Sequence, residues 1–230
     1  MAIERHDFAS TEALAEALAD TVANDLAEGI AARGAGVLAV SGGSTPKRFF
    51  KALSSRALDW PHVYVTLVDE RWVEPSSDRS NAKLVHNLLL TDDAASARFV
   101  PLWSGGDEPT EASVAETNAN LGQLPLPFDA VILGMGNDGH TASFFPGGDT
   151  LGAALNSDGP ALPLKAPGAG EPRITLTLPV LLNTHSLYLH IEGADKAATL
   201  EKAMADGAVE DMPVRAVLRQ EDTPVHIYFA

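Results

Sequence analysis

Asp138 and His140 lie two residues apart in a glycine-rich run that follows an apolar segment. Histidine is the side chain whose ordinary pKa lies nearest neutrality, which suits it to accept and return protons. A neighbouring carboxylate can fix the tautomer of the imidazole and stabilise its protonated form. We therefore take His140 as a candidate general base with Asp138 as its partner. The alternative is that His140 only satisfies hydrogen bonds within a turn.

A second chemically suited group follows the first strand-like run of the chain. Gly42 and Gly43 allow backbone conformations that turn several N–H groups in one direction, while Ser44 and Thr45 supply hydroxyl donors. Pro46 opens a helical pattern, whose N-terminus adds the positive end of its dipole. The loop is predicted to bind a phosphate or carboxylate, although it lacks the glycine and lysine spacing of a P-loop. A tight turn with capping hydroxyls is the alternative.

Charged residues also cluster directly after the strand-like run 63–68. Arg71 has the fork-shaped guanidinium that binds phosphate well. The carboxylates of Asp69 and Glu70 would then orient that arginine or a sugar hydroxyl. A solvated loop with local ion pairs is the alternative.

The elements that must position these groups alternate between strand and helix. Helices are predicted at 10–34, after 46, and at 80–90, 111–121, 194–205 and 213–219, and strands at 37–40, 63–68, 129–133, 173–178, 186–191 and 225–229. The segment 146–172 is rich in glycine, proline and alanine, and we expect it to be irregular. The alternation predicts one α/β domain over residues 1–230, with a parallel sheet covered by helices on both faces. Ligands of open parallel sheets bind beyond the carboxyl ends of the strands, where all three polar loops are expected.

The composition excludes several other kinds of chemistry. The chain has no cysteine, which excludes thiol nucleophiles, disulfides and thiolate metal sites. Its 31 acidic and 16 basic residues give a net charge of -15, which argues against nucleic acid and anionic membranes as partners. We find no secretory pattern in the first eight residues, no run that fits a membrane span and no recognised metal motif, so no metal is predicted.

One glycine pattern points to a different function. Gly134, Gly136 and Gly139 match the G-x-G-x-x-G spacing of dinucleotide-binding folds, and Asp158 follows at about the expected distance. However, Asp158 lies in the turn-rich run 156–160, and the loop belongs to the third strand–helix unit rather than the first. The context therefore disfavours a nicotinamide cofactor.

The motifs together resemble those of the 6-phosphogluconolactonase family in order and spacing, over essentially the whole chain. They are SGGSTP at 41–46, DERWV at 69–73, RSN at 79–81, GMGNDGHTASFFPG at 134–147 and RITLT at 173–177. The resemblance implies a modified doubly wound α/β/α fold of three layers, similar to glucosamine-6-phosphate deaminase and ribose-5-phosphate isomerase. It implies hydrolysis of 6-phospho-D-glucono-1,5-lactone in the oxidative pentose phosphate pathway, with no metal and no organic cofactor.

The same resemblance implies roles for individual residues. His140 and Asp138 would be catalytic, and the residues that would bind substrate are Gly42, Gly43, Ser44, Thr45, Asp69, Arg71, Lys165 and Arg173. Lys165 begins the run KAPGAG, which departs from the Lys-Pro-Pro-like stretch of the family. The expected partner is a small sugar-phosphate lactone, and we expect a cytoplasmic protein with a slight preference for the monomer.

Two rival functions stay open on the sequence. Deaminases of the superfamily carry a glutamate shortly after the histidine, in a Phe-Asn-Glu-Pro stretch, whereas the matching run SFFP at 143–146 has no acid. A lactone needs only an activated water and a proton for its ring oxygen, so the missing glutamate favours hydrolysis over isomerisation with deamination. A non-catalytic sugar-phosphate binder is the other rival, and the presence of both Asp138 and His140 favours the enzyme.

Overall fold

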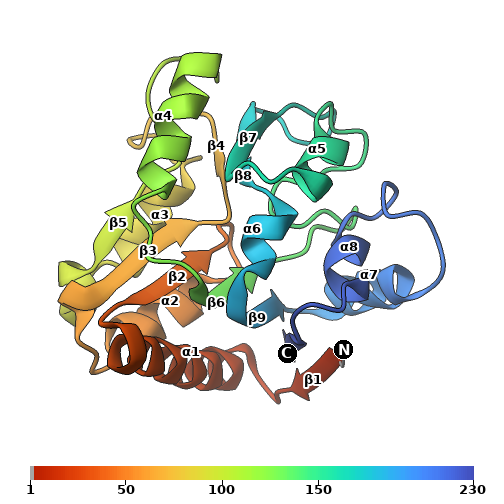
Figure 1. The fold of residues 1–230 in the computed structure, drawn as a ribbon. Helices are drawn as coiled ribbons and strands as arrows, with labels where there is room; N and C mark the ends of the chain where they lie inside the picture. The colour runs from red at the N-terminus through yellow and green to blue at the C-terminus, as the bar shows by residue number, and fades with distance from the viewer. Residues whose placement is uncertain (1–2) are drawn as a thin grey trace.

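Seven parallel strands form the main sheet of the computed structural model, which describes residues 3–230 (Figure 1). Their order across the sheet is β1-β10-β9-β6-β2-β3-β5. The strands are β1 (Ile3–Asp7), β2 (Gly36–Val40), β3 (Val63–Leu67), β5 (Arg98–Val100), β6 (Phe128–Leu133), β9 (Thr184–Ile191) and β10 (Val225–Phe229). A smaller antiparallel sheet has the order β4-β8-β7, with β4 at Asp69–Arg71, β7 at Ala161–Leu164 and β8 at Arg173–Leu176.

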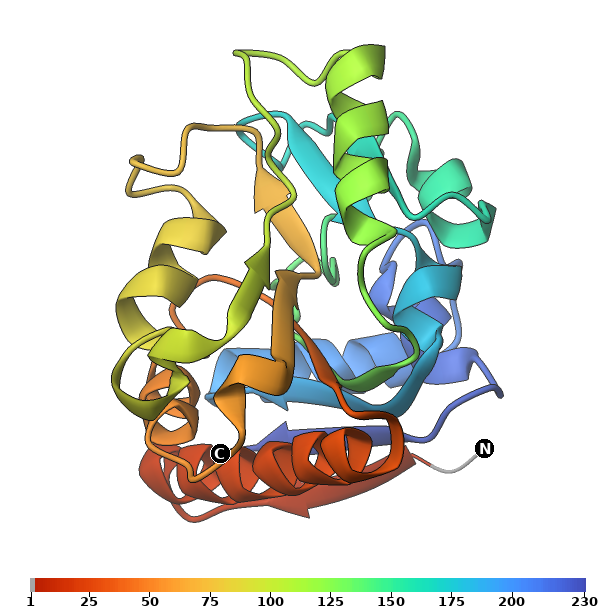
Figure 2. The same cartoon turned by 60° about the vertical axis from the view of Figure 1, so that its left-hand side comes forward.

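Helices flank the main sheet, as the alternating pattern predicts. They are α1 (Thr11–Arg33), α2 (Lys47–Ser54), α3 (Asn81–Leu88), α4 (Glu111–Leu121), α5 (Leu151–Asn156), α6 (Leu178–Leu182), α7 (Ala194–Met204) and α8 (Val214–Arg219), with short 3-10 turns at Trp60–His62 and Asp92–Ser96. Helix α1 runs along the main sheet, and α4 and α5 stand beside the smaller sheet (Figures 1 and 2). The α/β fold class predicted from the sequence is confirmed.

Helix α1 begins and ends where its capping residues predict. The Ser10 hydroxyl accepts a hydrogen bond from the Ala13 N–H at 3.1 Å, and Gly34 adopts φ 78° while its N–H bonds Ile30 O at 2.8 Å. One face of the helix is fully buried, with leucine or valine recurring every four residues: Leu14, Leu18, Val22 and Leu26. This periodic apolar face is what fixes α1 against the sheet.

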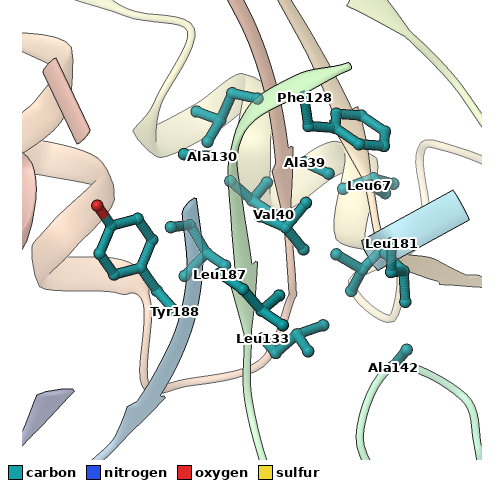
Figure 3. Packing of buried hydrophobic residues seen from close by; sticks show 14 of the residues in the cluster. Ala39, Val40, Leu67, Phe128, Ala130, Leu133, Ala142, Leu181, Leu187 and Tyr188 are labelled. Atoms are coloured by element: carbon teal, nitrogen blue, oxygen red, sulfur yellow. The ribbon is translucent and has the colours of Figure 1, made fainter. Parts of the chain in front are cut away.

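The centre of the core lies around β2, β6 and β9. All residues of β2 and β6 are buried, which explains why residues 37–40 and 130–133 form continuous apolar runs rather than alternating ones. Figure 3 shows Val40, Leu133 and Leu187 from these three strands packed together. The carboxyl ends of β2 and β6 therefore have a rigid base, and the loops that follow them start from it.

Two local expectations were wrong, and one alternative is excluded. Asp69–Arg71, for which a solvated loop was the alternative, is a strand, because it pairs with β8 and its two acidic residues are buried. Strand β8 belongs to the smaller antiparallel sheet, not to the main parallel one. The segment expected to be irregular contains α5 and β7, which are short and carry little periodicity, and β7 includes a proline at the edge of its sheet.

The buried carboxylate of Asp129 joins α1 and β2 to β6. Its Oδ2 accepts from the Val37 N–H at 2.8 Å, and its Oδ1 pairs with Arg33 Nη2 at 2.5 Å. Asp129→Ala would leave a buried N–H without a partner, and we expect the free energy of unfolding to fall by about 3 kcal/mol in urea denaturation. Asp7→Ala, which removes an exposed pair with Arg5, is the control and should change it by less than about 0.5 kcal/mol. Equal losses in the two variants would contradict this account.

Candidate active site

A cavity of about 310 Å³ lies where the loops after β2, β6 and β9 meet the β4–β8 pair. Eight of the ten residues predicted from the sequence line it: Gly42, Gly43, Ser44, Thr45, Asp69, Arg71, His140 and Arg173. Four further polar residues of the lining, Ser41, Asn81, His190 and Lys196, have no predicted role, although Ser41 and Asn81 lie in the motifs of the chain. The cavity lies where the rule for the carboxyl ends of parallel strands predicts a ligand.

The loop between β2 and α2 is shaped by two glycines with different requirements. A Cβ on Gly42 would lie 1.9 Å from Asn81 Oδ1, so the loop can approach Asn81 only with glycine there. Gly43 adopts φ 93°, a conformation that side chains disfavour. The Asn81 amide donates to Asp69 O at 2.9 Å, which ties the start of α3, the neighbour of this loop, to β4. Helix α2 then starts at Lys47, and its free N–H groups lie beside the cavity.

The turn after β6 holds the predicted catalytic pair. The Gly136 N–H bonds His140 O at 2.8 Å, and Gly139 takes φ 81° to let the chain fold back. His140 Nδ1 lies 2.6 Å from Asp138 Oδ1, and the same oxygen accepts from the His140 N–H at 3.1 Å. The ring also stacks on Phe145 at 4.1 Å between centroids. Because Asp138 occupies Nδ1, Nε2 is the ring nitrogen left for proton transfer.

Electrostatics keep Asp138 ionised. Partial burial raises the pKa of Asp138, but the hydrogen bonds and charge of His140 outweigh it, so the pKa is lowered overall. The carboxylate can therefore orient the imidazole and stabilise its protonated form. Asp138 itself does not line the cavity, which fits a role behind the ring.

Buried charges on the small sheet form the opposite wall. Asp69 Oδ2 accepts from the Ser143 hydroxyl at 2.5 Å and lies 3.6 Å from Arg173 Nη1. Arg173 also donates to Ala169 O at 2.6 Å, and its guanidinium sits 5.2 Å from the centroid of Phe145. Burial lowers the pKa of Arg173 and the charge of Asp69 opposes this effect. Asp69 thus holds a buried cation at the cavity.

Arg71 and Glu70 have separate tasks on β4. Arg71 Nη1 donates to Arg79 O at 2.6 Å, and its buried Nε has no partner among the described residues. Glu70 is buried and accepts from the Ser80 hydroxyl and from the N–H groups of Asn81 and Ala82 at 2.8–3.0 Å. Glu70 therefore caps α3, while Arg71 keeps a donor for a ligand.

The two candidate lysines differ in position. Lys165 is exposed, pairs with Glu108 at 2.7 Å and does not line the cavity. Lys196, in the first turn of α7, lines it instead. Burial lowers the pKa of Lys196, and the charge of Asp138 opposes that shift. Lys196 shares the cavity lining with His140, and its signal in the sequence was its position soon after the carboxyl end of β9.

Within residues 3–230, the group of side chains with metal-ligating geometry is Glu4, His6 and His226. None of the three lines the cavity, and His226 already pairs with Glu4 at 3.3 Å. Over the same residues, no helix has the length and apolar character that a membrane crossing requires.

The close approach of Gly42 to Asn81 allows a test of the loop at residues 42–45, here called the anion loop because it is predicted to bind a phosphate or carboxylate. Gly42→Ala would push the loop away from Asn81, and we expect inorganic phosphate to bind at least about tenfold more weakly in calorimetry. Asn81→Gly in the same chain removes the clashing atoms and should restore part of the affinity. Unchanged phosphate binding in Gly42→Ala would contradict the assignment of this loop.

Comparison with known proteins finds relatives that match over most or all of the chain. A family model described as glucosamine-6-phosphate isomerases/6-phosphogluconolactonase matches residues 9–226. A 6-phosphogluconolactonase of Rhizobium meliloti is 53% identical over 100% of both chains, and that of Pseudomonas aeruginosa is 43% identical over 88% of this chain and 85% of its own. The crystal structure of a 6-phosphogluconolactonase from Shewanella baltica superposes with a TM-score of 0.96 at 40% identity, covering 99% of this chain and 97% of that one.

A more distant relative shares the fold alone. A monomeric glucosamine-6-phosphate deaminase superposes with a TM-score of 0.79 at 18% identity, over 98% of this chain and 97% of its own. The similarity to the deaminase fold predicted from the sequence is therefore confirmed. Together, the matching model and the full-length relatives show that the chain belongs to the glucosamine-6-phosphate isomerase/6-phosphogluconolactonase family.

Proposed function

We propose that the chain hydrolyses 6-phospho-D-glucono-1,5-lactone to 6-phosphogluconate, the reaction that the names of its full-length relatives indicate. The observation that carries this proposal is the Asp138–His140 pair, with a 2.6 Å contact, beside a cavity that has an anion loop and several cations. This arrangement joins a proton acceptor to a phosphate site within one small cavity.

The phosphate of the substrate binds the loop between β2 and α2. Backbone N–H groups of residues 42–45 and the start of α2 supply donors and a positive dipole end. Arg71 and Arg173 add positive charge from the small sheet. The lysine that contributes is Lys196, which lines the cavity, rather than Lys165, which pairs with Glu108. The rest of the chain is strongly acidic, so these local cations decide whether an anion binds.

The chemical step is a proton-assisted hydrolysis. His140 Nε2 takes a proton from water, and the water oxygen attacks the lactone carbonyl carbon. The tetrahedral intermediate collapses by breaking the bond between that carbon and the ring oxygen. His140 then returns the proton to the ring oxygen, and Asp138 stabilises the protonated imidazole in between. Atoms balance, because the water supplies the new hydroxyl and its proton ends on the sugar.

The oxyanion of the intermediate requires donors of its own. The backbone N–H groups of the glycine turn and the ammonium of Lys196 are the two candidates. Lys196 and His140 line the same cavity, which makes this ammonium available to the intermediate.

The deaminase reaction is the second candidate within the family, and the stretch after His140 disfavours it. At the matching positions Phe145 stacks on the His140 ring and the Ser143 hydroxyl donates to Asp69. The stretch 143–146 itself therefore supplies no carboxylate that could open and isomerise a sugar ring. Turnover of glucosamine 6-phosphate would overturn the preference for hydrolysis.

His140→Asn tests the general base. We expect kcat to fall about 10²–10⁴-fold while KM changes little, because proton transfer is lost and the phosphate loop is intact. The assay follows hydrolysis of freshly generated lactone with EDTA present and the spontaneous rate subtracted, so it also tests the predicted independence from metal. His62→Asn, an exposed histidine that pairs with Asp59, is the control and should keep full activity. A His140→Asn protein with the wild-type rate would refute the assignment.

Asp138→Asn tests the partner of the base. We expect kcat to fall about 10²-fold, because an amide cannot stabilise the protonated imidazole as a carboxylate does. Because the pKa of Asp138 is lowered from its ordinary value of 3.8, the carboxylate is ionised at every pH above 3.8 and gains a proton only at lower pH. The loss in kcat should therefore be constant over the alkaline plateau of the pH profile, where the base is unprotonated in both proteins. A loss that disappears on this plateau would show that another group is responsible.

The cytoplasmic location and the monomeric state stay predictions.

A further inference from the structure

An ion pair with two hydrogen bonds joins the loop that follows β4 to the loop that precedes β8. Arg79 Nε donates to Glu171 Oε1 at 2.7 Å, and Arg79 Nη2 donates to Glu171 Oε2 at 3.0 Å. Arg79 lies in the loop between β4 and α3, and Glu171 lies in the loop between β7 and β8. A two-point contact fixes direction as well as distance, so it holds the two loops in one relative position.

Each partner of this bridge is connected to an arginine of the cavity. The carbonyl of Arg79 accepts a hydrogen bond from Arg71 Nη1 at 2.6 Å. Glu171 precedes Arg173 by two residues, and the intervening Pro172 accepts from the Trp72 N–H at 2.7 Å. The bridge therefore holds the backbone that carries both guanidinium groups.

Charge gives a second reason for the bridge. Arg71 and Arg173 are directly paired in the antiparallel register of β4 and β8, where like charges repel. The charges of Arg71 and Arg79 both oppose protonation of Arg173, while Asp69 and Glu171 favour it. Asp69 is buried within the site, so Glu171 is the outer carboxylate that offsets three neighbouring arginines.

We propose that the Arg79–Glu171 bridge is a positioning device for Arg71 and Arg173, which sets the affinity for the phosphate group of the substrate. The proposal rests on the proposed function for the identity of that substrate. The bridge does not touch His140, so its loss weakens binding and leaves the chemical step intact.

Glu171→Gln tests the bridge, because it removes the charge and keeps the size of the side chain. We expect KM for the lactone and Kd for inorganic phosphate each to rise about three- to tenfold. We expect kcat to stay within about twofold of the wild-type value. Glu171→Asp keeps the charge and should recover part of the affinity.

Asp78→Asn is the matched control. Asp78 lies in the same loop and pairs with Lys83 at 2.7 Å, but it is exposed and makes no bond to the β7–β8 loop among the described residues. KM, Kd and kcat should all equal those of the wild type. Should Glu171→Gln fail to fold, Arg79→Lys removes the two-point contact from the other side and carries the same expectation.

Two results would overturn the proposal. One is a Glu171→Gln protein with wild-type KM and phosphate Kd, and the other is a kcat that falls as much as KM rises. A wild-type protein that binds phosphate without hydrolysing the lactone would instead overturn the proposed function. In that case the phosphate Kd of Glu171→Gln still decides whether the bridge sets affinity.

Discussion

The site depends on how the chain leaves the main sheet at Val68. The Val68 N–H still bonds Val40 O on β2, whereas the Val68 carbonyl accepts from the Leu176 N–H on β8. One residue therefore belongs to both sheets, and β4 starts in the smaller sheet directly after it. This switch brings Asp69 and Arg71 over the carboxyl ends of the parallel strands. Without it, the cations of β4 and β8 would not face the loops that follow β2 and β6.

The catalytic turn depends on a part of the chain that is distant in sequence. A Cβ on Gly139 would lie 2.8–2.9 Å from three side-chain atoms of Met212, so this residue packs directly against the turn. The Gly139 carbonyl also accepts from the Val214 N–H at 2.9 Å. Buried Arg215 in turn donates to the carbonyl of Ala203 in the last turn of α7 and to the carbonyl of Ala208 in the segment that follows it. The spacing of Asp138 and His140 thus rests on the C-terminal helices.

The parts of the fold that could be predicted from the sequence are those that local rules determine. Helix α1 was predictable because its caps and its four-residue apolar repeat agree, and α4 begins at Glu111 and ends at Leu121 as predicted. Strand β4 was not, since three charged residues form a strand only through pairing with β8. The order of residue types along the chain does not indicate which distant segments pair as strands.

The candidate site shows the same division. The glycine loop and the histidine turn could be predicted because glycine and histidine each suit a small number of structural and chemical tasks. Lys196 lies at the start of a helix and His190 near the end of a strand, and neither position has a distinctive sequence pattern. The rule that ligands meet the carboxyl ends of parallel strands applies to β9 as well, so it could have drawn attention to both. Lys165 was matched by its place in a motif, and its ion pair with Glu108 depends on a loop that no local rule positions.

The acidic character of the chain is compatible with the proposed anionic ligand because carboxylates act on two of the three cavity cations. Asp69 lies against Arg173, and the charge of Asp138 acts on Lys196. Arg71 instead donates to the carbonyl of Arg79. The proposed phosphate would therefore meet arginines that existing contacts already order, and little side-chain entropy would be lost when it binds. Local order of a few cations, rather than the net charge of -15, is what would make an anion site in this chain.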